Sequence, residues 1–86
     1  AGQSLLTAVD RTTKSAGLAS AIRRIEPEGP DTVRVWLEGA RFEVLARWLV
    51  GLEQRFGVAA SSANLERGDS SGQVDARLTL TTGAGP

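Results

Sequence analysis

Cysteine, histidine, methionine and tyrosine are all absent from this chain of 86 residues. Without cysteine or histidine, the chain has no disulfide, no thiolate or imidazole metal ligand, no thiol nucleophile and no imidazole base. Only two tryptophans and two phenylalanines supply aromatic surface. We therefore expect no catalytic residue, no metal and no cofactor, and each aromatic position needs its own explanation.

An excess of charge of either sign is also absent, because ten basic residues balance ten acidic ones. Nucleic acids and anionic membranes attract proteins through a net positive field, so we expect neither as a non-specific partner. No apolar run approaches the roughly 18 residues of a membrane helix, and the chain begins at Ala1 without a signal peptide. The sequence therefore predicts one domain over residues 1–86, excised from a longer protein, with frayed ends at 1–2 and 81–86.

Periodicity divides the chain into two similar halves, each with a helix followed by two strands. Apolar residues three and four apart predict helices over residues 3–16 and 41–56. Alternating or β-branched stretches predict strands over residues 19–29, 32–39, 58–68 and 73–81, of which the second and fourth alternate most cleanly. The expected core stripe of the second helix is Phe42, Leu45, Leu49, Leu52 and Phe56.

The order αββαββ predicts an α+β fold, a four-stranded antiparallel sheet with both helices on one face, which is the ferredoxin-like plan. Ferredoxin-like chains normally begin with a strand, so this order is a circular permutation of that plan. In the usual sheet order, strands 32–39 and 73–81 are central. The adjacent Arg23 and Arg24 and the serine run at 61–62 then fall on the edges, where polar residues discourage unwanted pairing.

Trp36 lies on the polar side of its own strand and therefore on the outer face of the predicted sheet, beside Arg34 and Arg77. Two interpretations stay open. In one, the guanidinium groups of Arg34 and Arg77 cover the indole on a solvated sheet. In the other, Trp36 anchors a protein interface, where tryptophan and arginine are the most enriched residues.

The second predicted helix carries a strip of three residues, Val44, Trp48 and Gly51, beside its core stripe. An interior glycine costs a helix up to about 1 kcal/mol relative to alanine. Gly51 therefore predicts the close approach of another helix, either the first helix or one of a second copy. We interpret Trp48 as packing at the core margin, but keep it in the candidate protein interface, which comprises Trp36, Arg34, Arg77, Arg23, Arg24, Val44, Trp48 and Gly51.

Three short patterns are interpreted without a special function. The string RGDS at residues 67–70 resembles an adhesion tripeptide, but glycine, aspartate and serine are also what a hairpin loop requires. Glu26, Glu28 and Asp31 lack the spacing of a calcium loop and are read as a solvated acidic turn. Trp36 alone, without the aromatic signature of RNA-recognition domains, does not predict RNA binding.

The run "GLASAIRRIEPEGPDTVRVWLEGARFEVLARWLVGLEQRFGV", followed by "VDARLTL", resembles the C-terminal periplasmic domain of general secretion pathway protein M. This family is the M component of the bacterial type II secretion system. The similarity extends from Leu5 to Leu80, and "VRVWLEGARFEVLARWL" is its most recognisable part. The resemblance implies a permuted ferredoxin-like fold, in agreement with the order of elements.

The resemblance also implies a function and a location. Members are bitopic inner-membrane proteins of Gram-negative bacteria with this domain in the periplasm, and the family's membrane helix and stalk are not in this sequence. They are non-enzymatic scaffolds for pseudopilus assembly and protein export. Their expected partners are a second copy, as a homodimer, the L component and other inner-membrane platform components. The family contributes no catalytic residue and no cofactor.

Two alternatives remain. Ferredoxin-like modules also bind small ligands in clefts, for which this sequence offers only Arg23, Arg24 and Asn64 as polar candidates. A related platform component of pilus assembly would show the same physical features with a different partner.

Overall fold

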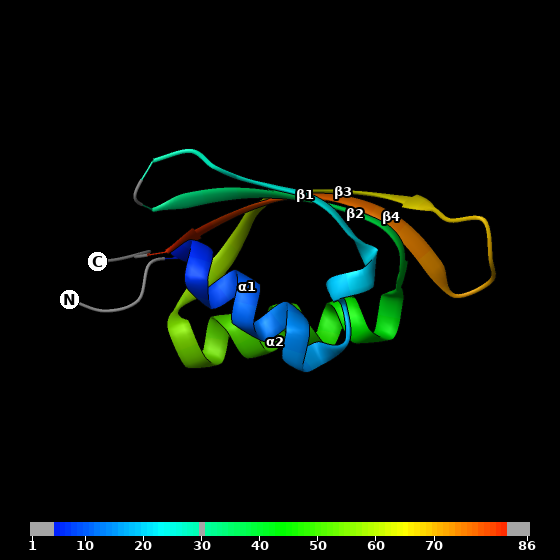
Figure 1. Ribbon diagram of the computed structural model, residues 1–86, viewed down its shortest axis with the longest axis horizontal. Coiled ribbons are helices and arrows are strands. Elements are labelled where there is room, and N and C mark those ends of the chain that lie inside the picture. Colours follow the sequence, from blue (N-terminus) through cyan, green and yellow to red (C-terminus); the bar gives the residue numbers. More distant parts are fainter. Residues whose placement is uncertain (1–4, 30, 83–86) are drawn as a thin grey trace.

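The helix and strand order is the predicted one, with one added short helix. The computed structural model describes residues 5–29 and 31–82. The elements are α1 (Leu5–Ala16), a 3-10 helix (Ala19–Ala21), β1 (Ile22–Pro27), β2 (Thr32–Arg41), α2 (Phe42–Phe56), β3 (Val58–Arg67) and β4 (Gln73–Thr82), as Figure 1 shows. The prediction of a strand at residues 19–21 is wrong, since they form the 3-10 helix. The Ala21 amide donates to the Leu18 carbonyl at 2.9 Å, and both side chains are buried.

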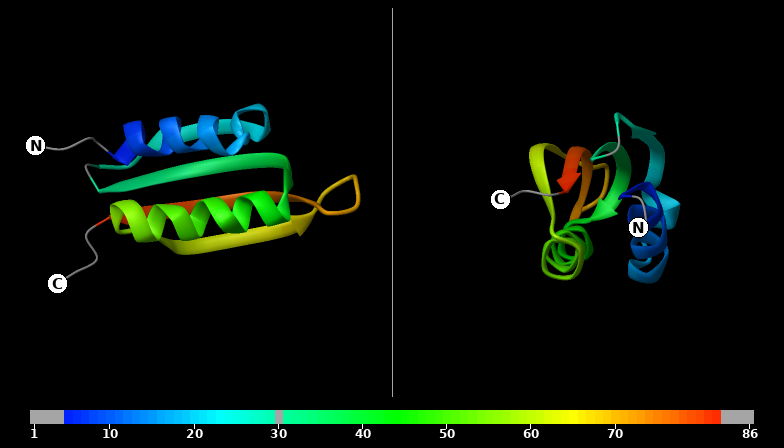
Figure 2. Two further views of the ribbon diagram at one scale, coloured as in Figure 1. Left: turned by 90° about the horizontal axis from the view of Figure 1, so that it is seen from below. Right: turned by 90° about the vertical axis from the view of Figure 1, so that its left-hand side faces the viewer.

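The four strands form one antiparallel sheet in the order β1-β2-β4-β3. Both helices lie on one face of it, α1 beneath the β1 side and α2 beneath the side of β3 and β4 (Figures 1 and 2). This is the predicted α+β arrangement, with the two cleanly alternating strands in the centre. Within residues 5–29 and 31–82, no helix lies on the opposite face of the sheet.

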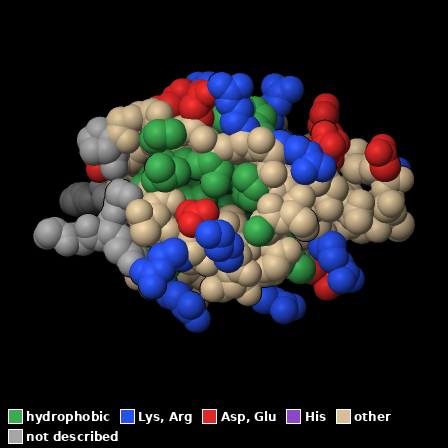
Figure 3. All heavy atoms as spheres, viewed as in Figure 1, with side chains coloured by type: hydrophobic (Ala, Val, Ile, Leu, Met, Phe, Trp, Pro, Cys, Tyr) green, Lys and Arg blue, Asp and Glu red, His purple; other side chains and the backbone are tan. Residues whose placement is uncertain are grey.

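The core lies between the sheet and the helices, where the central strands place alternate side chains. Three of the four buried residues of β2 pair in register with buried residues of β4, and the fourth, Ala40, pairs with partly buried Val74. Figure 3 shows apolar side chains gathered between the β1 edge and α1, where the core comes closest to the surface. The three buried register pairs of β2 and β4 are Val33 with Leu80, Val35 with Leu78, and Leu37 with Ala76.

Strand β2 continues directly into helix α2, and a bulge at Gly39 makes this possible. The register with β4 shifts between Leu37 and Ala40, and Gly39 has φ of 69°, a left-handed conformation that favours glycine. The Gly39 amide donates to Asp75 Oδ1 at 3.0 Å. The first amide of the helix, that of Phe42, donates to the Gly72 carbonyl at 3.0 Å, so the β3–β4 turn fixes where α2 begins.

The buried stripe of α2 differs from the predicted one. Phe42 and Phe56 are 49% and 42% exposed, whereas Leu45, Trp48 and Leu52 are buried. The helix is therefore rotated toward α1, because the indole of Trp48 offers more apolar surface than either end phenylalanine. Leu49, the central residue of the predicted stripe, is only partly buried against the core.

Two other predictions need correction at the ends of the described segment. Thr81 and Thr82 were expected to be frayed, but they belong to β4, and the Thr82 amide donates to the Asp31 carbonyl at 3.0 Å. Leu6 belongs to the apolar spacing that predicts the helix over residues 3–16, but it is 38% exposed. The other predicted frayed residues, and the predicted helix start at Gln3, lie outside the described residues. Between residues 5 and 82, leaving out residue 30, no helix is long and apolar enough to span a membrane.

The buried stripe of α2 gives the first testable prediction. Replacing Leu45 by alanine should lower the free energy of unfolding by about 2 to 5 kcal/mol, because it leaves a cavity in the core of a small domain. Val50→Ala, on the exposed side of the same helix, is the control and should change stability by no more than about 0.5 kcal/mol. Urea unfolding followed by circular dichroism measures both, and equal effects would show that the helix orientation is wrong.

Candidate protein-interaction surfaces

The eight predicted interface residues separate into two surfaces on opposite sides of the molecule. The strand residues lie on or beside the outer face of the sheet, and the helix residues lie on α2, on the other side. A single interface therefore does not contain all eight. The outer-face set is Arg23, Arg24, Arg34, Trp36 and Arg77, and the helix set is Val44, Trp48 and Gly51.

A row of four side chains crosses the outer face of the sheet, one from each strand. Arg24 pairs in register with Trp36, Trp36 with Arg77, and Arg77 with Asn64. The guanidinium carbon of Arg24 lies 5.4 Å from the centre of the Trp36 ring, a cation–π contact. Arg24, on the edge strand, therefore covers the indole, whereas the prediction named Arg34 and Arg77. The cause is a bulge in β1 between Ile22 and Arg24, which moves Arg24 opposite Trp36.

Arg34 and the acidic turn form exposed ion pairs on the same side of the sheet. Arg34 Nε lies 3.1 Å from Glu28 Oε1, and Arg24 pairs with Glu26. Arg23 Nε lies 3.4 Å from Glu38 Oε1. Exposed pairs of this kind contribute about 0 to 1 kcal/mol each. They fit the interpretation of the acidic residues as a solvated turn, and no cluster of three metal-ligating side chains occurs within residues 5–29 and 31–82.

The polar candidates for a small-ligand site do not converge. Arg24 and Asn64 occupy the two ends of the outer-face row, and Arg23 lies at the β1 bulge beside Glu38. All three are exposed. The three residues therefore do not line a common cleft for a small ligand.

Strand β3 is an edge strand whose far part is uncovered on both faces. From Ala60 to Arg67 every residue is exposed, and the tip of the β3–β4 hairpin extends beyond the ends of both helices (Figures 1 and 2). Leu65 faces the helix side, opposite buried Ala76, yet is 47% exposed. The RGDS string lies at the tip of this hairpin, where Gly68 donates its amide to the Gln73 carbonyl at 2.8 Å, as a turn requires.

The two edges of the sheet differ in how well they are protected. Strand β1 has six residues, a bulge, two adjacent arginines and a terminal proline, all of which discourage pairing. Strand β3 has ten residues, and residues 58–65 contain no charge and no proline. Apart from a register shift between Ala60 and Ser62, its outer edge can accept another strand.

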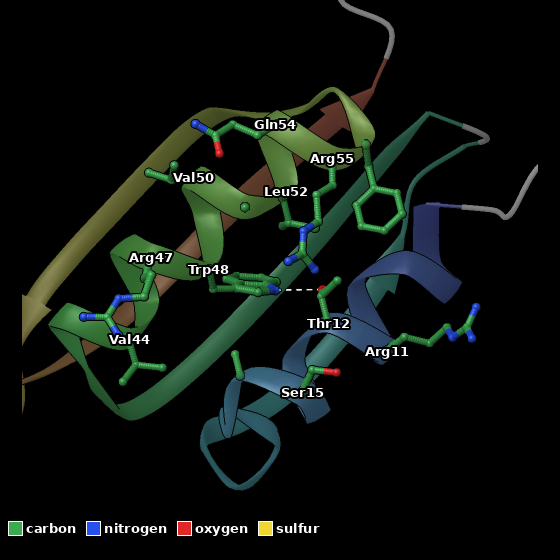
Figure 4. A pocket seen from close by; sticks show the side chains of 13 residues that line it. Arg11, Thr12, Ser15, Val44, Arg47, Trp48, Val50, Leu52, Gln54 and Arg55 are labelled. Atoms are coloured by element: carbon green, nitrogen blue, oxygen red, sulfur yellow. Dashed lines mark hydrogen bonds between the residues drawn. The ribbon is translucent and has the colours of Figure 1, made fainter.

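A groove of about 770 Å³ lies between α1 and α2, on the side of the molecule away from the sheet's open face (Figure 4). Its lining combines an apolar floor with three arginines and contains no acidic residue. The residues that line it are Arg11, Thr12, Ser15, Ala16, Val44, Arg47, Trp48, Val50, Gly51, Leu52, Gln54, Arg55 and Phe56.

One hydrogen bond joins the two helices at the floor of the groove. The indole Nε1 of Trp48 donates to Thr12 Oγ1 at 2.8 Å, and Thr12 in turn donates to the Ala8 carbonyl at 2.7 Å (Figure 4). Trp48 is 5% exposed, so its indole N–H would be costly to leave without a partner. This confirms the interpretation of Trp48 as a packing residue. Its ring lies at the floor of the groove and does not protrude into solvent.

Of the two neighbours predicted for Gly51, the first helix of the same chain is excluded. A Cβ atom built at Gly51 meets nothing within 4 Å, so the glycine is not needed for packing inside the described part of the chain. Gly51 lies in the groove lining, where it leaves the α2 backbone uncovered. The remaining alternative is a helix of a second copy.

Gly51 gives the second testable prediction. Gly51→Ala should raise the free energy of unfolding by up to about 1 kcal/mol, because alanine favours the helix and here meets open space. For a domain of this size that corresponds to about 4 to 8 °C in Tm. Gly57→Ala should do the opposite, since Gly57 caps α2 with φ of 67°. Differential scanning calorimetry compares the two, and a lower Tm for Gly51→Ala would contradict the open space.

Sequence reasoning missed the groove residues Arg11, Thr12, Arg47 and Arg55. The spacing of Arg47, Gly51 and Arg55 at intervals of four was visible as one face of a helix. Nothing in the sequence paired that face with α1, because Thr12 and Trp48 are 36 positions apart.

A family model for type II secretion system (T2SS), protein M, matches residues 5–82. The chain belongs to this family. Type II secretion system protein M of Vibrio cholerae serotype O1 (strain ATCC 39315 / El Tor Inaba N16961) is 33% identical over 61 residues, which are 70% of this chain and 36% of that protein. The chain thus spans little more than a third of that relative's length.

The fold matches a solved structure of the same family. The periplasmic domain of EpsM from Vibrio cholerae superimposes with a TM-score of 0.79 at 26% sequence identity, over 92% of this chain and 99% of that chain. The predicted resemblance to protein M and the predicted fold are both confirmed. The chain is therefore related to a secretion-system component over nearly the whole of a domain solved on its own.

Proposed function

We propose that this chain is the periplasmic domain of a bitopic inner-membrane protein of a Gram-negative bacterium and acts as a non-enzymatic scaffold of the type II secretion platform. Its role is to self-associate as a homodimer and to bind the L component, and so to support pseudopilus assembly and export. Its membership of the protein M family supports the assignment to the type II secretion system. The observation that carries the scaffold role is the long, unprotected edge of β3.

Self-association is assigned to the β3 edge. Antiparallel pairing of β3 with the same strand of a second copy would satisfy the outward backbone groups of both strands and extend each four-stranded sheet across a two-fold axis. The exposed side chain of Leu65 would be covered in that arrangement. The β1 edge, with its bulge and Pro27, is much less suited to this pairing.

Binding of the L component is assigned to the outer face of the sheet. Trp36 is half-buried beneath Arg24, so its indole is already held in one place. A rigid, partly desolvated tryptophan flanked by arginines resembles a hot spot, and docking there leaves the β3 edge free. The two contacts can therefore be broken separately.

The test of self-association uses light scattering. The wild-type domain should form a dimer, and Leu65→Lys should dissociate it, because lysine on an edge strand opposes strand pairing. Leu6→Lys introduces the same change at another exposed leucine, on α1, and should leave the dimer intact. A monomeric wild-type domain would contradict the proposed homodimer.

The test of the second contact is calorimetric titration with the matching periplasmic domain of the L component. Trp36→Ala should weaken binding by at least about tenfold, with little change in Tm, since the side chain packs outside the core. Leu65→Lys serves as the control and should bind L normally. Saturable binding that Trp36→Ala does not change would move the contact to another surface, and no binding at all would contradict the L partnership.

A further inference from the structure

Arg47, Gly51 and Arg55 form one face of α2 along the groove. They are spaced at intervals of four, so each lies about one turn from the next and the two arginines are about 12 Å apart along the helix axis. All three line the groove. In Figure 4, Arg55 extends toward Trp48 and Thr12, Arg47 extends toward the Val44 end of the groove, and Arg11 extends away from it.

Packing within the domain does not require glycine at position 51, but the binding of a helix in the groove would. Open space surrounds the position of its missing Cβ, so the helix carries an unfavourable residue without any gain in packing against α1. A helix laid in the groove could approach the α2 backbone more closely at Gly51 than at any residue with a side chain. The position is thus suited to a helix crossing.

The charges around the crossing point are uncompensated. The ion pairs of residues 5–29 and 31–82 use Lys14, Arg23, Arg24 and Arg34, and none of them includes Arg47 or Arg55. The lining contains no carboxylate, while exposed Val50 and Phe56 and partly buried Val44 provide apolar surface beside the arginines. The complementary ligand is therefore apolar at its centre and acidic at two points, one near each arginine.

A second copy of this chain does not fit that description. If two α2 helices crossed antiparallel at Gly51, Arg47 of each would face Arg55 of the other, because both arginines are four residues from the crossing point. A parallel crossing would bring like residues together. Like charges at an interface oppose binding, so the occupant belongs to a different protein.

We propose that the groove between α1 and α2 binds an acidic amphipathic helix of a partner protein, which crosses α2 at Gly51. This deepens the proposed scaffold function and rests on it, since it adds a third contact to the β3 edge and the outer sheet face. The helix presents a small residue at the crossing, apolar residues beside it, and carboxylates about two turns apart that pair with Arg47 and Arg55.

The experiment measures fluorescence anisotropy of a labelled synthetic peptide titrated with the 86-residue domain. The peptide is a leucine-faced helix with alanine at its centre and two glutamates spaced like Arg47 and Arg55. We expect saturable binding that weakens as salt rises. The same peptide with lysines in place of the glutamates should bind at least about tenfold more weakly.

Three variants locate the site. Arg55→Glu should weaken binding of the acidic peptide at least about tenfold, while Arg77→Glu, which makes the same change in net charge on the opposite face, should not. Gly51→Leu should also abolish binding, because its side chain fills the crossing point. Circular dichroism shows whether each variant is folded. If Gly51→Leu does not fold, Arg55→Glu still tests the site.

Several outcomes would overturn the proposal. They are failure of the acidic peptide to bind, equal binding of the lysine peptide, or full binding by Arg55→Glu. Dissociation of a homodimer by Gly51→Leu would show that a second copy occupies the groove instead. The scaffold function has its own readouts at Leu65 and Trp36, so peptide failure with an intact dimer and L binding would reject the groove alone.

Discussion

The burial of Trp48 against α1 is the contact on which the rest of the structure depends. Its indole is nearly sealed from solvent, and its one polar atom is satisfied by Thr12 across the gap between the helices. This pair sets the rotation of α2 about its own axis. Once that rotation is set, Leu45 and Leu52 face the sheet, and Arg47, Gly51 and Arg55 line a groove.

The second constraint is that two helices cover only part of a sheet whose longer strands have ten residues. The end of the β3–β4 hairpin extends beyond the helices, and inward-facing Leu65 of β3 remains 47% exposed. A protein that acted alone would gain by shortening this hairpin or by placing charges along its edge. Its present form is what a component of a larger assembly would retain, which is why the edge carries the proposed function.

Much of the fold was predictable because local and long-range preferences agree in β2 and β4, where strict alternation fixes which side chains face the helices. The rotation of α2 was not predictable, since Phe42, Leu49 and Phe56 form an equally regular stripe. The contact that decided between them comes from a polar residue of another helix, Thr12. The cation–π partner of Trp36 was missed for a similar reason, because a bulge in β1 places Arg24, and not the predicted Arg34 or Arg77, over the indole.

A double-mutant cycle between Thr12 and Trp48, followed by urea unfolding, tests the central claim most directly. Thr12→Val leaves the buried indole N–H without its acceptor, and Trp48→Phe leaves the hydroxyl without its donor. The two changes together remove both groups, so the double variant should be less destabilised than the sum of the single ones by at least about 1 kcal/mol. Strictly additive losses would show that the pair does not hold α2 in place, and the groove would then lose its structural basis.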